Sequence, residues 1–379
     1  MIAISGLSGN EIFCLRQQGM YPGDLVIGNS VFSLGIIGGI ASGLKTIVGG
    51  EVSEVTSIIH EGRQKAYARM LAEAEKHGGI GITGVNNELV QQVGNVEFLS
   101  IGSCVHQDQE KAEKLEFSTS ADGQELYCQI DAGFAPKKFV FGNVAYSIGL
   151  GGGILGSLKS LKRGEIKEFS SIFNQTRHLA LKRIQAEAQN AGANAVVGIQ
   201  TSIIPFAAMQ EMVMIGTASY HPALTSGFSH SPITSDLTNQ EMWNLINLGY
   251  MPLKLVLGVS VYSLGFVGGI TSAFKSFVRG EINELTTLIY EAREQAIAHI
   301  ATDARNSGAD QVVGIKTYVY QLGSGIIEFM AIGTAIKKLP GVSTHSTNLI
   351  PQAIISDRDT FINTAEGTTL TKLNQTSKT

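Results

Sequence analysis

Hydrophobic residues between positions 55 and 74 recur at spacings that keep them on one face of a helix. Val55, Ile58, Ile59, Ala66 and Met70 stand at offsets of 0, 3, 4, 11 and 15, and most residues between them are polar. The same spacing returns in two further stretches, at Phe169, Ile172, Phe173, Ala180 and Ile184 and at Leu285, Leu288, Ile289, Ala296 and Ile300. The pattern predicts three long amphipathic helices, each with one buried and one exposed face.

The sequence around these helices also repeats. The strings LVIGNSVFSLGIIGGI, FVFGNVAYSIGLGGGI and LVLGVSVYSLGFVGGI begin at Leu25, Phe139 and Leu255, which are 114 and 116 residues apart. Such self-similarity predicts three tandem modules: module 1 (residues 1–106), module 2 (120–221) and module 3 (236–338). Residues 339–379 are rich in Ser, Thr, Asn and Gln and are expected to form a flexible tail.

Each module opens with the signals of a short helix. A small polar residue precedes a glutamate by three positions, as in a capping box, and a glycine follows eight residues later. The three boxes are Ser8-x-x-Glu11, Asp122-x-x-Glu125 and Thr238-x-x-Glu241, and the glycines are Gly19, Gly133 and Gly249. We therefore interpret the three glutamates as helix caps rather than as catalytic groups.

Two β-branched runs follow each long helix and predict a hairpin. In module 2 they are AVVGIQTSI and EMVMIGTASY, and in module 3 they are QVVGIKTYV and EFMAIGTAI. Each module is thus predicted to be α+β: a small antiparallel sheet with one long helix packed on it and an extra short N-terminal capping helix.

Several of these motifs resemble the YbjQ-like family, whose members are described as putative heavy-metal-binding domains. The resemblance rests on the strands GNSVF and GVSVY, the GGE turn, the long helix and the segment GADQVVGI, and it covers all three modules. It implies a dodecin-like β-α-β-β subunit that assembles into rings, typically five-fold, with strands adding across subunit borders. It also implies heavy-metal binding, by analogy alone.

The overall charge narrows the possible partners. The formal net charge is −4 and the pI is about 6.1, so the chain has no basic footprint for nucleic acid. No basic segment precedes the first apolar residues, and three cysteines are an odd number for a secreted disulfide scaffold. We therefore expect a cytoplasmic protein.

The cysteines and histidines do not repeat as metal ligands would. Cys14 aligns with Cys128 but then with Asn244, and Cys104 aligns with Ala218 and Ala335. A soft metal needs clustered thiolates or imidazoles, so we assign no metal ligand and no cofactor, and we interpret Cys14 and Cys128 as buried structural thiols.

Charged residues do recur in all three modules. They are Lys45, Lys159 and Lys275; Glu51, Glu165 and Glu281; Arg63, Arg177 and Arg293; and Glu97, Glu211 and Glu328. One hypothesis places them in a polar pocket or in a ring of carboxylates around an assembly axis. The other, which we favour, is that they pair with helix dipoles and form ion pairs between modules. No nucleophile and base recur together, so we expect no enzymatic activity.

The glycine-rich segments carry a pattern of small residues spaced by four. The pattern is formed by Gly35 and Gly39, Gly149 and Gly153, and Gly265 and Gly269. It favours close packing, whereas the register of a phosphate-binding loop fails in every copy. Each segment also lacks charge for 20 residues, as in Leu25–Leu44, which leaves membrane contact as an alternative.

The leading functional hypothesis is a self-assembling protein of structural or scaffold type that forms a ring or shell. Five chains in three stacked five-fold rings is the arrangement that the resemblance suggests. The first alternative is a module that binds a heavy metal or a small ligand at module borders. A third is a membrane-associated oligomer that packs through its glycine-rich segments.

Overall fold

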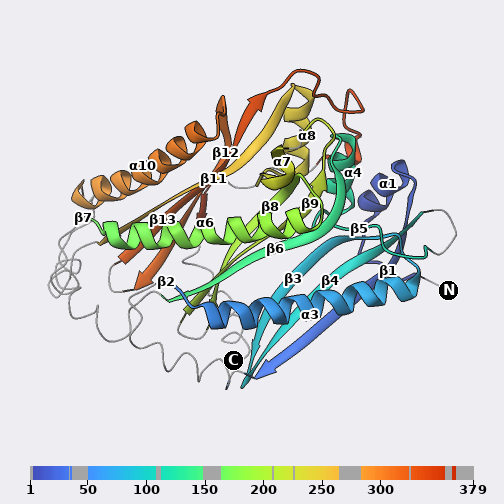
Figure 1. Ribbon diagram of the computed structural model, residues 1–379, viewed down its shortest axis with the longest axis horizontal. Coiled ribbons are helices and arrows are strands. Elements are labelled where there is room, and N and C mark those ends of the chain that lie inside the picture. Colours follow the sequence, from blue (N-terminus) through green and yellow to red (C-terminus); the bar gives the residue numbers. More distant parts are fainter. Residues whose placement is uncertain are drawn as a thin grey trace, which may run out of the picture.

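A computed structural model describes residues 3–33, 35, 50–107, 112–147, 164–206, 209–224, 227–263, 283–323, 326–354 and 361–363. Within these residues the fold is α+β, with one sheet of four strands and two of five, each accompanied by a long helix (Figure 1). The predicted fold class is therefore confirmed.

The elements follow one another in the same order in each module. Module 1 contains α1 (Gly9–Gln17), β1 (Met20–Ser33), β2 (Gly50–Glu51), α3 (Ser53–His77), β3 (Gly81–Gln92) and β4 (Asn95–Gln107). Module 2 and the linker before it contain β5 (Phe117–Ser118), α4 (Gly123–Asp131), β6 (Ala135–Ser147), β7 (Gly164–Glu165), α6 (Lys167–Asn190), β8 (Ala195–Phe206) and β9 (Met209–Tyr220).

The third set of elements begins in the second linker and ends in the C-terminal region. It contains α7 (Gly227–His230), β10 (Ile233–Thr234), α8 (Asn239–Asn247), β11 (Tyr250–Ser263), α10 (Asn283–Asn306), β12 (Gln311–Gly323) and β13 (Ile326–Lys338). A short 3-10 helix (Pro351–Ala353) and β14 (Phe361–Asn363) follow.

The short helices begin where the sequence places their caps. The side chain of Ser8 accepts from the amide of Glu11, and the side chain of Glu11 accepts in return from the amide of Ser8. Thr238 and Glu241 repeat this box at α8. At α4 the carboxylate of Asp122 accepts from two backbone amides of the first turn. These caps satisfy amides that a helix end would otherwise leave unpaired.

The sheets exchange short strands across module borders. Strand β2 of module 1 pairs antiparallel with β6 of module 2, and β7 of module 2 pairs in the same way with β11 of module 3. Glu51 and Glu165 therefore lie in these two strands. The helix-dipole interpretation had instead placed them in the first turns of the long helices. The sheets of modules 2 and 3 thus each contain backbone from the preceding module.

Each linker also contributes a strand, and this strand is parallel. Strand β5 pairs with β3, and β10 pairs with β8, while β14 pairs with β12. The sheets are consequently mixed, whereas the sequence predicted antiparallel pairing alone. The hydrophobic pattern of a two-residue strand is too short to reveal its direction.

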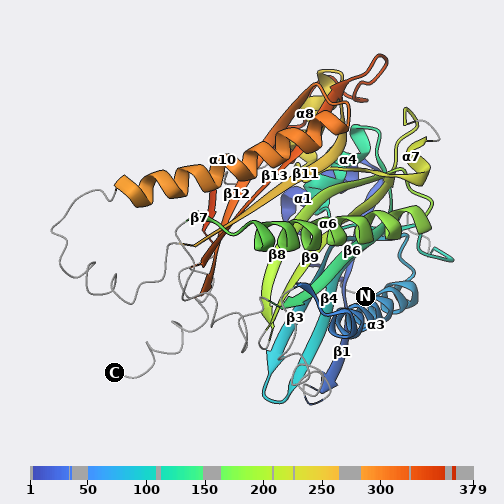
Figure 2. The same cartoon turned by 60° about the vertical axis from the view of Figure 1, so that its left-hand side comes forward.

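Each of the first two long helices packs between two sheets (Figures 1 and 2). Tyr67 and Met70 of α3 share a core cluster with Val26 of their own sheet and with Phe139 and Phe141 of the next. Helix α6 lies in the same way between the sheets of modules 2 and 3. Sheets and helices therefore alternate in layers that end with the sheet of module 1 on one side and α10 on the other.

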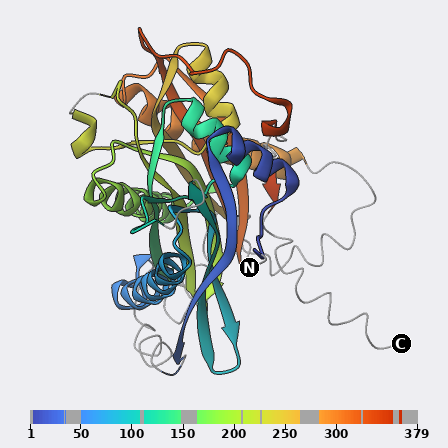
Figure 3. The ribbon, with the colours of Figure 1, turned by 90° about the vertical axis from the view of Figure 1, so that its right-hand side faces the viewer.

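The short helices α1, α4 and α8 gather at one end of the molecule, at the top of Figure 3. Residues 339–354, which the sequence placed in a flexible tail, pack against them. Val342 and Ala353 are buried, and the carboxylate of Asp131 accepts from the hydroxyl of Ser346 and the indole of Trp243. The apolar residues of this stretch are too few and irregular to form a periodic pattern.

A recurring glycine lets each long helix approach its own first strand. Gly28, Gly142 and Gly258 occupy equivalent positions in β1, β6 and β11. A Cβ atom at each would collide with a helix carbonyl, that of Ala180 in the case of Gly142. The helix backbone therefore rests directly on the strand at this point.

Replacing Gly142 with Ala should destabilise the protein by about 1–3 kcal/mol, because the helix has to move away from the sheet. Equilibrium urea denaturation measures this loss. Gly9→Ala is the matched control, since its Cβ would meet nothing within 4 Å and should leave the free energy of unfolding unchanged or slightly raised. Equal midpoints for the wild type and the Gly142 variant would contradict the proposed contact.

Candidate functional site

The border between modules 1 and 2 contains a buried ion pair. Nε and Nη2 of Arg63 on α3 donate to the two carboxylate oxygens of Glu211 on β9, at 3.0 and 2.7 Å. Nη1 donates to the backbone and side-chain oxygens of Asn87, at 2.7 and 2.8 Å. Both Arg63 and Glu211 are fully buried. The bidentate geometry and the additional acceptor offset the cost of removing both charges from water.

The border between modules 2 and 3 repeats this pair one module further along. Arg177 on α6 donates to Glu328 on β13 through Nε and Nη2, and its Nη2 also donates to the hydroxyl of Tyr146 at 2.8 Å. The guanidinium lies 4.3 Å from the centre of the Tyr146 ring. The carboxylate of Glu328 raises the pKa of Arg177, although burial acts against this, so the arginine remains charged.

The two borders differ in one hydrogen bond. Thr201 stands where module 1 has Asn87, and its side chain is too short to repeat the bond to the arginine. Among the described residues, Nη1 of Arg177 and Oγ1 of Thr201 are both buried without a partner. At the first border the equivalent nitrogen, Nη1 of Arg63, donates to Asn87, so the second border lacks a hydrogen bond that the first one has.

The remaining members of the Arg and Glu sets lie at the two ends of the layered array. Arg293 is exposed on α10, where its guanidinium lies 5.8 Å from the ring of Phe329. Glu97 is partly exposed on β4 and accepts from Asn29 and Gln92, each at 3.0 Å. The structure thus pairs the arginine of each of the first two modules with the glutamate of the following module.

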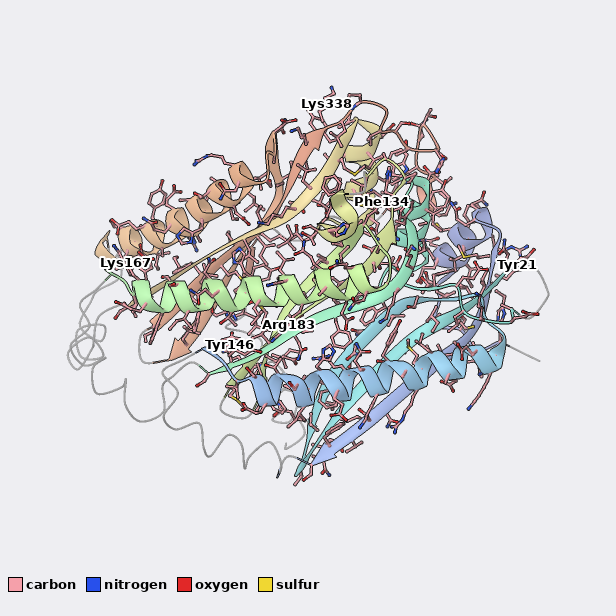
Figure 4. The ribbon with its side chains drawn as sticks, viewed as in Figure 1. Tyr21, Phe134, Tyr146, Lys167, Arg183 and Lys338 are labelled. Carbon is pink, nitrogen blue, oxygen red and sulfur yellow. The ribbon has the colours of Figure 1, made fainter. Side chains whose placement is uncertain are left out.

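Of the other predicted charges, the structure places Glu51 in a specific contact. Its carboxylate accepts from Nη2 of Arg183 on α6 at 2.7 Å, which joins modules 1 and 2 a second time. Figure 4 labels Arg183, which makes this contact, and Tyr146, which accepts from Arg177 at the second border. Glu165 is partly buried in β7. The three lysines, Lys45, Lys159 and Lys275, lie outside the described residues, as does Glu281.

A third carboxylate position at the borders was missed in the sequence. Glu73, Glu187 and Asp303 recur at the module offsets of 114 and 116. Glu187 of module 2 accepts from Gln64 of module 1 at 2.7 Å, and burial raises the pKa of Glu187. The repeat spacing was the signal, but the change from Glu to Asp in module 3 obscured it.

Asp303 connects modules 2 and 3 at the same position. Its carboxylate forms an ion pair with Lys254 of its own module and lies 3.8 Å from Nε2 of His178 of module 2. Burial acts to raise the pKa of Asp303, but the neighbouring side chains of His178 and Lys254 lower it below its ordinary value. Each described border therefore contains a second, less buried polar contact beside the Arg–Glu pair.

Within the described residues, no cluster of three or more His, Cys, Asp or Glu side chains has the geometry to hold a metal ion. Cys14, Cys104 and Cys128 are all buried and free of disulfides. Burial raises the pKa of Cys14 and of Cys104 to about 11, so both thiols are protonated at neutral pH. Protonated thiols are poor ligands for a soft metal.

One of the six close-packing glycines lies within the described residues. Gly35 is described, and its nearest side-chain neighbour is Ser33. Gly39, Gly149, Gly153, Gly265 and Gly269 lie outside the described residues. Among the helices that can be described, none is both long and apolar enough to cross a membrane.

Sequence comparisons agree with the threefold repeat. The profile of the YbjQ family, described as putative heavy-metal-binding, matches residues 20–106, 135–221 and 250–338. The encapsulin nanocompartment protein Rv1762c of Mycobacterium tuberculosis is 32% identical over 212 residues, which cover 54% of this chain and 79% of that protein. A UPF0145 protein of Pseudothermotoga lettingae is 40% identical over 85 residues (22% of this chain and 80% of the relative). A UPF0145 protein of Methanoculleus marisnigri is 36% identical over 88 residues (23% and 82%).

Replacing Glu328 with Gln should lower the free energy of unfolding by about 3–5 kcal/mol, because it leaves the charge of Arg177 buried without a counterion. Chemical denaturation followed by circular dichroism measures the change. The double variant Arg177→Met, Glu328→Leu should recover most of the loss. Glu168→Gln, on the exposed side of α6, should change stability by less than about 0.5 kcal/mol. Equal effects of the two Glu→Gln variants would contradict this role of the pair.

The three thiols should resist 5,5′-dithiobis(2-nitrobenzoate) at pH 8 in the native protein, since they are buried and, in Cys14 and Cys104, protonated. Unfolding in urea should make all three react within minutes. Absorbance at 412 nm counts the reacted thiols in both states. Rapid reaction of the folded protein would show that a thiolate is accessible.

Proposed function

The chain belongs to the YbjQ family, described as putative heavy-metal-binding, and from this premise we propose that it is a self-assembling structural protein without enzymatic activity. Its copies join end to end through the helix-on-sheet contact that joins its own modules. One observation carries the proposal: module 1 exposes the sheet face that modules 2 and 3 bury.

The exposed face is apolar at equivalent positions. Leu25, Ile27 and Val31 of β1 are 37%, 47% and 57% exposed. The equivalent residues are at most 1% exposed in the other modules, where α3 or α6 covers them: Phe139, Phe141 and Ala145 in module 2 and Leu255, Leu257 and Val261 in module 3. A row of large apolar residues on an open sheet face is typical of a surface that a partner covers.

The opposite end of the array offers a matching helix. Ile297 of α10 is 36% exposed, whereas its equivalents Tyr67 and Leu181 are each 3% exposed against the next sheet. Tyr290 is exposed on the same helix. Helix α10 therefore exposes residues at the positions that α3 and α6 use to contact the following module.

The polar groups at the two ends also match. The hydroxyls of Thr56 and Ser170 each accept a hydrogen bond from a strand amide of the next module, at 2.9 Å in both cases. Thr286 occupies this position on α10, and Val31 supplies the equivalent amide on β1. Together with Arg293 and Glu97, these groups would repeat the internal border between two chains.

The relatives support this proposal in two ways. The Mycobacterium tuberculosis relative is named as an encapsulin nanocompartment protein, which is a name for a shell assembly. The UPF0145 relatives match a single module of this chain over most of their own length. A module that serves as a whole protein in those relatives is joined covalently to two others here.

The covalent joining restricts the stoichiometry. A contact that uses different surfaces on the two partners produces a closed ring or an open filament. A ring closed by the proposed contact alone holds modules in multiples of three, so two chains would give six modules. The five-fold arrangement suggested by the resemblance would instead require each chain to place its modules in three separate rings.

Native mass spectrometry of the purified protein tests the proposal. We expect oligomers of whole chains, and Arg293→Glu should dissociate them, because the pair would bury two like charges. Leaving one charge of such a pair unmatched costs about 3–5 kcal/mol, which corresponds to at least a hundredfold weaker association. Combining Arg293→Glu with Glu97→Arg should restore the oligomer.

Lys76→Glu is the control, since it makes the same charge change at an exposed position of α3. It should leave the mass unchanged. A wild-type monomer of 40.3 kDa would refute self-assembly. Oligomers in multiples of five chains that persist in Arg293→Glu would favour stacked rings and count against the end-to-end contact.

A further inference from the structure

A cavity of about 170 Å³ lies at the border between modules 2 and 3. Strand β8 of module 2 lines it with Ile199 and Thr201, and module 3 contributes Lys316, Tyr318 and Ile332. Asp236, from the linker between the modules, closes it on another side. The exposed residues Gln200 and Ser202 also line it, so the cavity opens to solvent there.

A buried ion pair is built into the wall of this cavity. Lys316 and Asp236 are 5% and 3% exposed. Nζ of Lys316 donates to the backbone oxygen of Asp236 at 2.9 Å and to its carboxylate at 2.8 Å. An ammonium group has three donors, so these two bonds leave one N–H for a further acceptor.

The hydroxyl of Thr201 adds a second polar group. Its Oγ1 is buried and has no hydrogen-bond partner among the described residues. A buried hydroxyl without a partner loses its hydration without compensation. A ligand oxygen in the cavity could accept from both Thr201 and Lys316.

The charges lining the cavity cancel, which restricts the ligand. Lys316 and Asp236 are the ionised side chains among the lining residues, and they neutralise each other. An anion would lie beside the carboxylate and a cation beside the ammonium, and either would bury a net charge. An uncharged ligand avoids this cost.

The size and the apolar walls restrict it further. A cavity of about 150 Å³ lined by apolar side chains accommodates benzene. Here Ile199 and Ile332 are each 1% exposed, and the ring of Tyr318 provides an aromatic wall. A single six-membered ring with one polar substituent matches both the volume and the lining.

The ion pair is particular to this border. At the repeat-equivalent positions of the border between modules 1 and 2, Gln200 stands for Lys316 and Ser120 for Asp236. The modules therefore pack together without the ion pair at one border and with it at the other. The fold alone does not require a lysine and an aspartate here.

We propose that this cavity binds a small uncharged carbonyl compound built on one six-membered ring, whose oxygen accepts from Lys316 and Thr201. The ring lies between the two isoleucines and Tyr318. This site is independent of the proposed end-to-end assembly, because all of its residues belong to one chain.

Ligand-observed NMR titration of the full chain with benzamide tests the proposal. We expect a Kd of about 1 mM or below, as its nine non-hydrogen atoms allow. Benzoate has the same shape and a negative charge, and it should bind at least tenfold more weakly. Failure of benzamide to bind at about 10 mM, or equal binding of benzoate, would overturn the proposal.

Variants locate the binding. Thr201→Val keeps the shape of the side chain and removes the hydroxyl, and it should weaken benzamide binding about three- to tenfold. Thr317→Val, at the equivalent position of module 3 and outside the cavity lining, should bind as the wild type does. Unchanged affinity in Thr201→Val would refute the site.

The double variant Lys316→Gln, Asp236→Ser installs the residues of the other border and should abolish binding. Thermal melting checks that the double variant folds. If it does not fold, the affinity of Thr201→Val for benzamide tests the site. Arg293→Glu should retain full benzamide affinity. This separates the outcome from that of the assembly experiment.

Discussion

The structure depends on the packing of the long helices α3 and α6 against two sheets each. Helices α3 and α6 each pack on their own sheet and on the sheet of the next module, so neither can reach its final environment within a single module. A fully buried Arg–Glu pair lies at the centre of each of these contacts. The modules therefore share hydrophobic clusters across their borders rather than forming independent units connected by linkers.

The ion pairs also determine how the layers align. If α6 were displaced by one turn along the sheet of module 3, Arg177 would remain buried without a carboxylate. Apolar packing alone tolerates such shifts better, because apolar contacts are not directional. The strands β2 and β7 add backbone hydrogen bonds to the same alignment, since each extends the sheet that the next helix layer covers.

Repetition of one contact explains why the two ends of the array are unlike its interior. Leu25 and Ile27 are exposed although their equivalents are buried, because none of the long helices that the structure describes covers this face of module 1. The same repetition allows local differences between borders. Thr201 in place of an asparagine and Lys316 in place of a glutamine leave the layers intact while changing the chemistry of the second border.

The repeat, the α+β class of each module, the caps of the short helices and the buried stripe of each long helix were predictable from the amino-acid sequence. These features follow from local spacing, such as the box at Ser8 and the glycine at Gly19, and local spacing is visible in one copy. It also identified the recurring arginines and glutamates, but not which of them meet.

The pairing of Arg63 with Glu211 of the following module, rather than with Glu97 of its own, became visible in the three-dimensional arrangement of the sheets. The two glutamates are equivalent in sequence, and the choice depends on which sheet lies against the outer face of α3. The same holds for the two-residue strands, for the packing of residues 339–354 and for the cavity at Lys316. Each joins segments that are distant in the chain, and a pattern within one segment contains no information about the partner on which it folds.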